Sequence, residues 1–259
     1  MENTNLTQME RNDVSLRDLE RDNYRELSAN NYRELGADKL VGTILMRKMF
    51  TWMTLALIIT GIAAWTVASS PELVAAIYGS TILFYGFIIA EVGLVLLLSA
   101  LIDRMSLITA TIMLVAYAVI NGITLSYIFI IYTADSIATT FFVTAGTFGA
   151  MSIYGYKTQR DLSKWSSLLF MALIGLILAG LVNLFMRNDT FSYIISGIGV
   201  LVFVGLTAYD VNKLKNTLNE ADEVNESTQK LALIGALSIY LDFINLFIYL
   251  LRILGTRRR

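Results

Sequence analysis

Residues 238–255 read SIYLDFINLFIYLLRILG, an apolar run close to the length of a membrane span, with one carboxylate, Asp242, near its middle. A bare carboxylate in hydrocarbon costs about 2.5–3.5 kcal/mol on insertion scales, so such a group is usually protonated, paired or facing a water-filled path. A second acid, Asp210, lies at the end of the preceding apolar run, in LTAYDVNKLK over residues 206–215. We interpret the rest of the chain as a cage around these two acids.

The composition is that of a membrane protein. Of the 259 residues, 56% are hydrophobic, which exceeds the roughly 45–50% of an ordinary soluble domain. Several runs of about 20 apolar residues predict an all-α polytopic membrane protein. The formal net charge of -1 gives no reason to expect a nucleic-acid partner.

Two residue types are missing from the chain, and their absence limits the kinds of catalytic and metal-binding sites that it can form. There is no Cys and no His. This excludes thiol catalysis and disulfides, and it removes most zinc and transition-metal sites. We therefore expect no tightly bound cofactor, and any response to pH must use carboxylates rather than imidazole.

Residues 1–44 are predicted to form a separate polar tail, and residues 45–259 the transmembrane domain. The tail holds nine of the 21 acidic and six of the 20 basic residues. It contains a near-repeat, DNYRELSA over residues 22–29 followed by NNYRELGA over residues 30–37, and it lacks the short apolar core of a signal peptide. Two interpretations stay open: a mobile soluble tail, or a docking segment built on the paired Tyr-Arg-Glu-Leu motifs.

Seven apolar runs are long enough to cross a membrane, and the short loops between them make sequential neighbours antiparallel. We expect a short loop at residues 71–72. Small residues at close spacing in the fourth run, Ala145 with Gly149 and Gly146 with Ala150, are expected to serve ordinary helix packing. The expected spans cover residues 50–68, 76–101, 107–132, 137–156, 165–186, 191–214 and 231–255.

The loop Lys and Arg residues predict a cytoplasmic amino terminus. The opposite loops carry only Arg187, and the side of the carboxyl terminus stays open. Seven full crossings put Arg257–Arg259 outside, against the positive-inside rule, whereas six crossings and a re-entrant seventh segment put that cluster inside. The basic residues on the predicted cytoplasmic side are Arg47, Lys48, Arg104, Lys157, Arg160, Lys164, Lys213, Lys215 and Lys230.

Four ionisable groups lie within or at the ends of the apolar runs: Glu91, Asp210, Asp242 and Arg252. Two carboxylates close together in a low-dielectric site cannot both ionise at low cost, so such a pair can share one proton. When ionised, their oxygens are the ligands that a hard cation such as calcium prefers. Protonation weakens that cation site, so a pair formed by the two aspartates would couple pH to cation permeation.

Each of these groups also has a structural interpretation. Asp210 lies three residues from Lys213, about one helical turn, so it is alternatively an interfacial acid neutralised by local cations. Asp242 is alternatively held by a hydrogen bond to Asn or Tyr without further function. Glu91 is equally deep, and its pairing with Arg252 is a hypothesis. On simple spans the two aspartates differ in depth by about 10 Å, so pairing requires an earlier start of the seventh helix or snorkelling of the neighbouring lysines.

At these residues the chain resembles the Bax inhibitor-1 family, also called the transmembrane Bax inhibitor motif family, and its bacterial YccA-like branch. The resemblance covers about residues 44–255 and leaves the tail outside. The resemblance rests on two blocks and two shorter matches. The blocks are Tyr209-Asp210 with the Lys-containing helix end, and YLDFINLF over residues 240–247 continuing to Leu251-Arg252. The shorter matches are Arg47-Lys48 and EVGL over residues 91–94.

The resemblance implies a seven-helix bundle in which the C-terminal helix is central. It also implies that Asp210 and Asp242 form a hydrogen-bonded pair that senses pH and gates a leak of calcium, which both carboxylates would bind transiently. In the family an arginine near the end of the second helix competes for the first aspartate. Arg104 is the nearest candidate for this arginine, which would act as a latch on the first aspartate. It lies further along the chain from Glu91 than the family pattern predicts.

Three hypotheses for the function stay open. The first is a pH-sensitive calcium-permeable leak channel gated by the aspartate pair. The second is a membrane-embedded modulator of a membrane protease or of a stress or cell-death pathway, without transport activity, whose partner contacts the tail. The third, an intramembrane protease, is disfavoured because Asp242 follows Leu rather than Gly, so we expect no enzyme. The predicted location is the bacterial inner membrane, with the lipid bilayer and calcium as partners.

Overall fold

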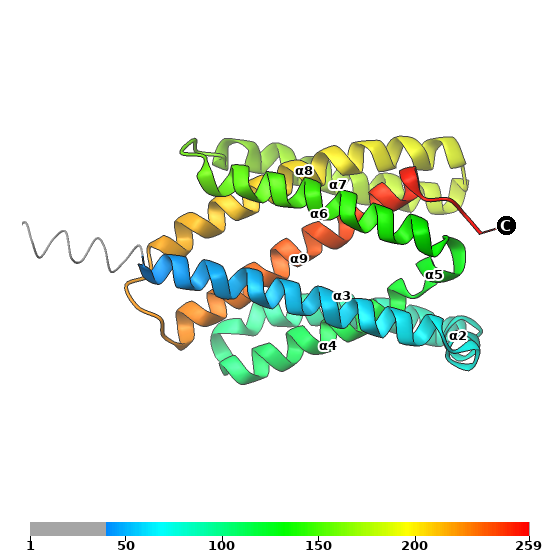
Figure 1. Ribbon diagram of the computed structural model, residues 1–259, viewed down its shortest axis with the longest axis horizontal. Helices are drawn as coiled ribbons and strands as arrows, with labels where there is room; N and C mark the ends of the chain where they lie inside the picture. The colour runs from blue at the N-terminus through cyan, green and yellow to red at the C-terminus, as the bar shows by residue number, and fades with distance from the viewer. Residues whose placement is uncertain (1–39, 259) are drawn as a thin grey trace, which may run out of the picture.

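A computed structural model describes residues 40–258 of the protein, and Figure 1 shows a bundle of long helices. The expected all-α polytopic membrane fold is confirmed, because seven helical segments of the described chain are long and apolar enough to cross a membrane. These spans are Leu40–Ala68, Thr81–Arg104, Leu107–Ile131, Ala134–Lys157, Ser163–Met186, Asp189–Asn219 and Glu226–Leu254.

The spans are built from the following elements, labelled as in Figure 1. The first span, Leu40–Ala68, is followed by a short helix, α2 (Pro71–Tyr78). The second span joins α3 (Thr81–Leu101) to the 3₁₀ turn η1 (Ile102–Arg104), and the third joins α4 (Leu107–Leu125) to α5 (Tyr127–Ile131). The last four spans are α6 (Ala134–Lys157), α7 (Ser163–Met186), α8 (Asp189–Asn219) and α9 (Glu226–Leu254).

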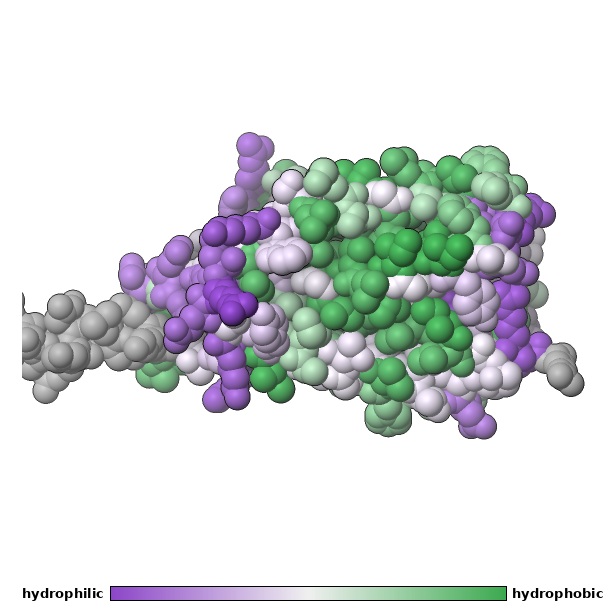
Figure 2. Space-filling view, turned by 90° about the horizontal axis from the view of Figure 1, so that it is seen from above, coloured by the Kyte–Doolittle hydropathy of each residue, from purple (hydrophilic) through white to green (hydrophobic). Residues whose placement is uncertain are grey.

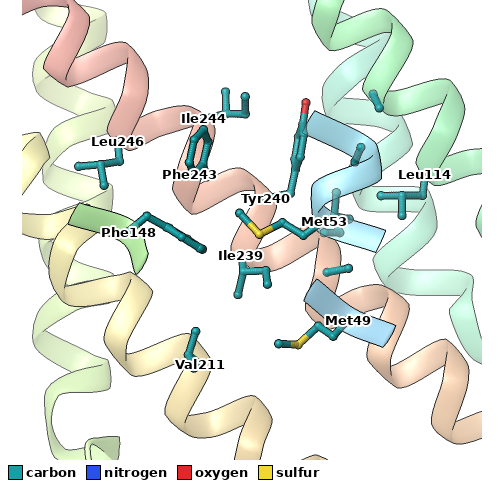
Figure 3. Close-up of a cluster of buried hydrophobic side chains, with 14 of the residues drawn as sticks. Met49, Met53, Leu114, Phe148, Val211, Ile239, Tyr240, Phe243, Ile244 and Leu246 are labelled. Carbon is teal, nitrogen blue, oxygen red and sulfur yellow. The ribbon is translucent and has the colours of Figure 1, made fainter. Parts of the chain in front are cut away.

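Helix α9 lies at the centre of the bundle, as expected. Of its apolar stretch 67% is buried, against 6% for α3 and for α7 and at most 39% for the other spans. Figure 3 shows Ile239, Tyr240 and Phe243 of α9 packed among side chains of the surrounding helices, with Met49 and Met53 of the first span on one side and Phe148 of α6 on the other. The most apolar helices therefore face lipid, and the helix that carries Asp242 is shielded from it.

The bundle has an apolar belt between two polar ends. Figure 2 shows green apolar side chains across the middle of the visible face and purple polar side chains at either end. We call the end where Leu40 lies the first end, and the opposite end the second end. The chain finishes at the second end (Figure 1). Helix α9 therefore crosses the whole bundle, and the alternative of a re-entrant seventh segment is wrong.

Three helices extend further at the first end than we predicted. The first span includes residues 40–49, α8 continues to Asn219 rather than to residue 214, and α9 begins at Glu226 rather than at residue 231. Polar residues continue these helices outside the apolar belt, and a capping box between Asn225 and Thr228 starts α9. The predicted domain boundary at residues 44 and 45 falls inside the first helix, and the tandem repeat lies outside the described residues.

The loop expected at residues 71–72 is wrong, because Pro71 begins α2. Pro is favoured in the first turn of a helix, where its missing N–H would have no partner, and the Ser70 side chain accepts a hydrogen bond from the Leu73 N–H. The Tyr78 hydroxyl at the end of α2 contacts the Ser126 hydroxyl, 2.8 Å away, where α4 breaks before α5. Helix α2 thus contacts and stabilises the break between α4 and α5, which lies in the third span at the second end.

Close helix packing does not use the glycines that the spacing suggested. A side chain on Gly146 or Gly149 would meet no neighbouring atom within 4 Å. A side chain on Gly155 would instead collide with the backbone of Ala208 in α8. The Gly155 carbonyl also accepts a hydrogen bond from the Asn212 side chain, at 3.0 Å. Gly155 therefore lets α6 and α8 approach each other two residues from Asp210.

Gly155→Leu is expected to push α6 and α8 apart and to lower the free energy of unfolding by about 1–3 kcal/mol or more. Gly146→Leu on the same helix is the control, because its side chain enters open space. Unfolding in mixed detergent micelles measures both variants, and equal stability of the two would contradict this packing.

Candidate functional site

Asp210 and Asp242 line the same cavity, which has a volume of about 400 Å³ and lies among α7, α8 and α9. Among residues 40–258, Lys213 is the one cationic residue of its lining. The lining residues are Ser166, Phe170 and Leu173 of α7; Phe203, Leu206, Tyr209, Asp210 and Lys213 of α8; and Ser238, Leu241, Asp242 and Asn245 of α9. The structure thus brings together the two acids that the sequence singled out.

Asp210 is tied to α9 through a serine. The Ser238 hydroxyl donates a hydrogen bond to Asp210 Oδ2, with 2.5 Å between the oxygens. Ser238 precedes Asp242 by four residues, which places the two side chains on one face of α9, about 6 Å apart along its axis. The carboxyl of Asp210 therefore lies about one helical turn from that of Asp242. The direct hydrogen bond between the two aspartates that the resemblance implied is not formed, because Asp210 accepts from Ser238 and the buried Oδ2 of Asp242 has no partner among the described residues.

Asp242 has a different environment, since its side chain is only 6% exposed. Its Oδ2 atom is buried and accepts no hydrogen bond from the described residues. A buried carboxylate without a partner is costly. This oxygen is therefore the position in the cavity where a proton, a water molecule or a cation would be most stabilising. No Asn or Tyr of the described chain donates a hydrogen bond to Asp242, so the alternative of a structural hydrogen bond is not realised there.

Helix direction reduces the expected difference in depth between the two acids. Helix α9 begins earlier than predicted and runs obliquely across the bundle (Figure 1), so each of its residues adds less than 1.5 Å of depth. Of the two neighbouring lysines, Lys215 snorkels: its Nζ donates hydrogen bonds to the carbonyls of Tyr156 and Thr158 at the end of α6, at 3.1 and 3.2 Å. The amine is thereby directed away from Asp210 toward the first end. Lys213 instead lines the aspartate cavity.

The other predicted site residues lie elsewhere. Arg104 is exposed in the η1 turn, and no hydrogen bond in the described chain joins it to Asp210. Glu91 faces Asn121 and Thr124, and its Oε1 is buried without a hydrogen-bond partner among residues 40–258. Arg252 instead stacks over the ring of Tyr249, 5.7 Å from its centroid. The hypothetical pair of Glu91 and Arg252 is therefore not formed in this structure.

Arg252 belongs to a separate cavity of about 390 Å³ at the second end, whose lining includes Asp189 and Arg257. The end of the chain is fixed beside it, because the Arg258 N–H donates to the Ile131 carbonyl at 2.7 Å and the Thr133 N–H to the Thr256 carbonyl at 3.0 Å. The basic carboxyl terminus is thus anchored to the turn between α5 and α6.

Sequence reasoning missed a buried polar cluster on the opposite side of α9. The Tyr240 hydroxyl donates to Asn121 Oδ1 at 2.8 Å and lies 2.7 Å from the Thr60 hydroxyl. Thr60 in turn donates to the Ala118 carbonyl at 2.9 Å. The cluster links α9 to the first span and to α4. Sequence also missed Ser238, although its position one turn before Asp242 was a usable signal.

The described residues contain no group of three or more acidic side chains that could hold a metal ion. Two carboxylates with one serine between them offer few of the six to eight oxygen ligands that a resident calcium ion takes. Chemically, the cavity suits a transient cation or a shared proton better than a permanently bound metal.

The fold and the site define an all-α polytopic membrane protein whose last helix runs through the middle of the bundle and presents a buried acid to a cavity among α7, α8 and α9. The chain belongs to the Bax inhibitor-1 family: the family model described as "Inhibitor of apoptosis-promoting Bax1" matches residues 43–259. It is 49% identical over 214 residues to the Inner membrane protein YbhL of Escherichia coli (strain K12), covering 82% of this chain and 92% of that protein.

Two further relatives agree over a similar length. A protein of Rickettsia prowazekii (strain Madrid E) is 45% identical over 217 residues, which cover 82% of this chain and 89% of the relative. A protein of Borreliella burgdorferi (strain ATCC 35210) is 42% identical over 213 residues, with 82% and 92% covered.

Tyr240→Phe is expected to lower the free energy of unfolding by about 1–3 kcal/mol, because it leaves the buried Asn121 Oδ1 without a donor. Tyr249→Phe on the same helix is the control. Its ring remains, and its hydroxyl makes no hydrogen bond with the described residues, so a change below about 0.5 kcal/mol is expected. Equal losses in the two variants, measured by unfolding in mixed micelles, would show that the cluster does not stabilise the fold.

Proposed function

We propose that the protein is a pH-sensitive, calcium-permeable leak channel in which Asp210 and Asp242 form the gating pair. One observation carries the proposal: both carboxyl groups line a single cavity, and one buried oxygen of Asp242 has no hydrogen-bond partner in the described chain. An ionisable residue within a membrane span is by default a functional-site hypothesis.

The gating follows from the charge on the pair. With one proton on the pair, the two aspartates together carry one negative charge, which Lys213 in the same lining partly compensates, and α8 and α9 stay together through Asp210 and Ser238. A rise in pH removes that proton, so two negative charges face each other in a low-dielectric site and repel. The same step exposes oxygen ligands for a hard cation. Loss of the proton therefore both loosens the contact between α8 and α9 and attracts calcium.

Orientation and location complete the proposal. The first end, which carries the basic loops around Arg104, Arg160 and Lys164, is the cytoplasmic end by the positive-inside rule. The arginines that finish the chain then lie outside, which is tolerable because the first helices usually dominate orientation. The name of the Escherichia coli relative, an inner membrane protein, supports the bacterial inner membrane as the location.

Calcium flux into vesicles that contain the purified protein is expected to rise severalfold as the pH is raised from acid to alkaline. Asp242→Asn cannot share or lose this proton, so its flux should be low and independent of pH. Glu91→Gln is the matched control, because it neutralises another acid within the membrane spans, one that is half-buried and does not line the cavity. An unchanged pH profile in Asp242→Asn, or an equally flat one in Glu91→Gln, would count against the aspartate pair.

A second candidate function is a membrane-embedded modulator of a membrane protease or of a stress pathway, without transport. The tandem Tyr-Arg-Glu-Leu repeat of the tail favours it. The structure sets the truncation point: Gly42 is buried against Asn219 of α8, so a deletion should stop at residue 39.

Deletion of residues 1–39 is expected to leave calcium flux unchanged if the channel proposal holds, and to reduce partner capture if the tail is a docking segment. Flux and co-purification of membrane proteins are measured on the same preparations. If the wild-type protein shows no flux and the deletion removes a specific partner, the second function replaces the first.

A further inference from the structure

A groove separate from the aspartate cavity opens between the first span and α6. It has a volume of about 630 Å³ and a predominantly apolar lining. Its floor includes Phe243 of α9 and Phe148 of α6, whose rings meet edge to face with centroids 5.4 Å apart. Figure 3 shows these two aromatic side chains next to each other. An apolar groove in the side of a membrane-spanning bundle is open to the lipid.

The groove exists because α6 carries small residues along it. Ala145 and Gly149 both belong to its lining, and a side chain on Gly149 would meet no atom within 4 Å. The spacing of these residues had suggested close packing with another helix. The structure shows instead that they leave room for a slender apolar chain.

Two cations lie at the first-end mouth of the groove. Arg47 of the first span and Lys157, the last residue of α6, both line it and are both exposed. The described residues provide neither of them with a hydrogen bond or an ion pair from an acidic side chain. The mouth therefore carries two positive charges above an apolar interior, and charge complementarity calls for an anionic group there.

A third polar group lies deeper in the groove. The Ser152 hydroxyl lines it, is buried, and has no hydrogen-bond partner among the described residues. Ser152 precedes Lys157 by five residues, or about 7.5 Å along α6. This is close to the thickness of one interfacial layer of a bilayer, about 5–7 Å. This spacing matches a lipid whose phosphate meets the cations at the mouth while its ester groups meet Ser152.

We propose that this groove binds an anionic phospholipid of the surrounding membrane. Its phosphate lies between Arg47 and Lys157, an ester oxygen accepts a hydrogen bond from Ser152, and one acyl chain follows the aromatic floor. A neutral lipid would fill the same apolar volume but would leave the two cations uncompensated. Each basic residue at an anionic membrane surface is expected to favour the lipid roughly fivefold.

The test uses the full-length protein in vesicles of equal phosphatidylcholine and phosphatidylglycerol, followed by mild detergent extraction and native mass spectrometry of the retained lipid. The wild-type protein is expected to retain phosphatidylglycerol in preference to phosphatidylcholine. Arg47→Ala with Lys157→Ala should lower that preference roughly 25-fold, which is fivefold for each residue. Exchanging the cations, as Arg47→Lys with Lys157→Arg, should preserve it.

Two matched controls separate the groove from general electrostatic attraction. Arg160→Ala with Lys164→Ala removes the same charge at the same end but does not touch the groove, so it should retain the lipid. Gly149→Phe fills the groove without changing charge and should lose the lipid, whereas Gly146→Phe, which lies outside the lining, should keep it. Size-exclusion profiles identify any variant that does not fold.

Three results would overturn the proposal. The first is equal retention by the wild-type protein and by the variant that lacks Arg47 and Lys157. The second is an equal loss in the variant that lacks Arg160 and Lys164, which would reveal only diffuse attraction. The third is lipid binding that appears only after residues 1–39 are deleted, which would make the protein's own tail the occupant.

Discussion

Burial of the Asp242 carboxyl is the physical constraint on which the rest of the structure depends. The side chain is 6% exposed and lies in the middle of a membrane span, a position that is tolerable only away from lipid. The other helices must therefore surround α9, and they do so unequally. Helices α3 and α7 bury little of their apolar surface and face the lipid, whereas α8 and α6 pack against the central helix. The bundle is organised to enclose the one helix that carries a buried carboxyl in the middle of its apolar run.

Helix α9 presents polar groups on two opposite faces. Residues advance about 100° each around a helix of 3.6 residues per turn, so Tyr240 and Asp242 lie roughly 200° apart, whereas Ser238 and Asp242 lie within roughly 40°. The tyrosine face is hydrogen-bonded to Asn121 and the Thr60 hydroxyl lies beside it, which stabilises one position of the helix. The aspartate face keeps an oxygen without a partner. The first face therefore anchors the helix, and the second is the face to which the proposed function assigns the exchange of a proton or a cation.

Much of this could be predicted from sequence, because lipid imposes length and polarity on every span. The seven apolar runs, the central last helix and both aspartates follow from that constraint together with the family resemblance. Helix ends were less predictable, since α8 and α9 continue into polar sequence outside the apolar belt. Partners across helices were not predictable at all: Tyr240 meets Asn121, 119 positions earlier in the chain. The packing role assigned to Gly149 failed because spacing alone does not say whether a neighbouring helix comes close.

The central claim is that a proton on the aspartate pair holds α8 and α9 together, and a distance measurement tests it most directly. The chain has no Cys, so spin labels can be placed by Asn216→Cys on α8 and Ser227→Cys on α9, both exposed at the first end. In membranes, the distance between the labels should increase as the pH is raised, and in an Asp242→Asn background it should not change. A distance that stays the same at every pH in the unmodified background, or the same increase without Asp242, would contradict the account.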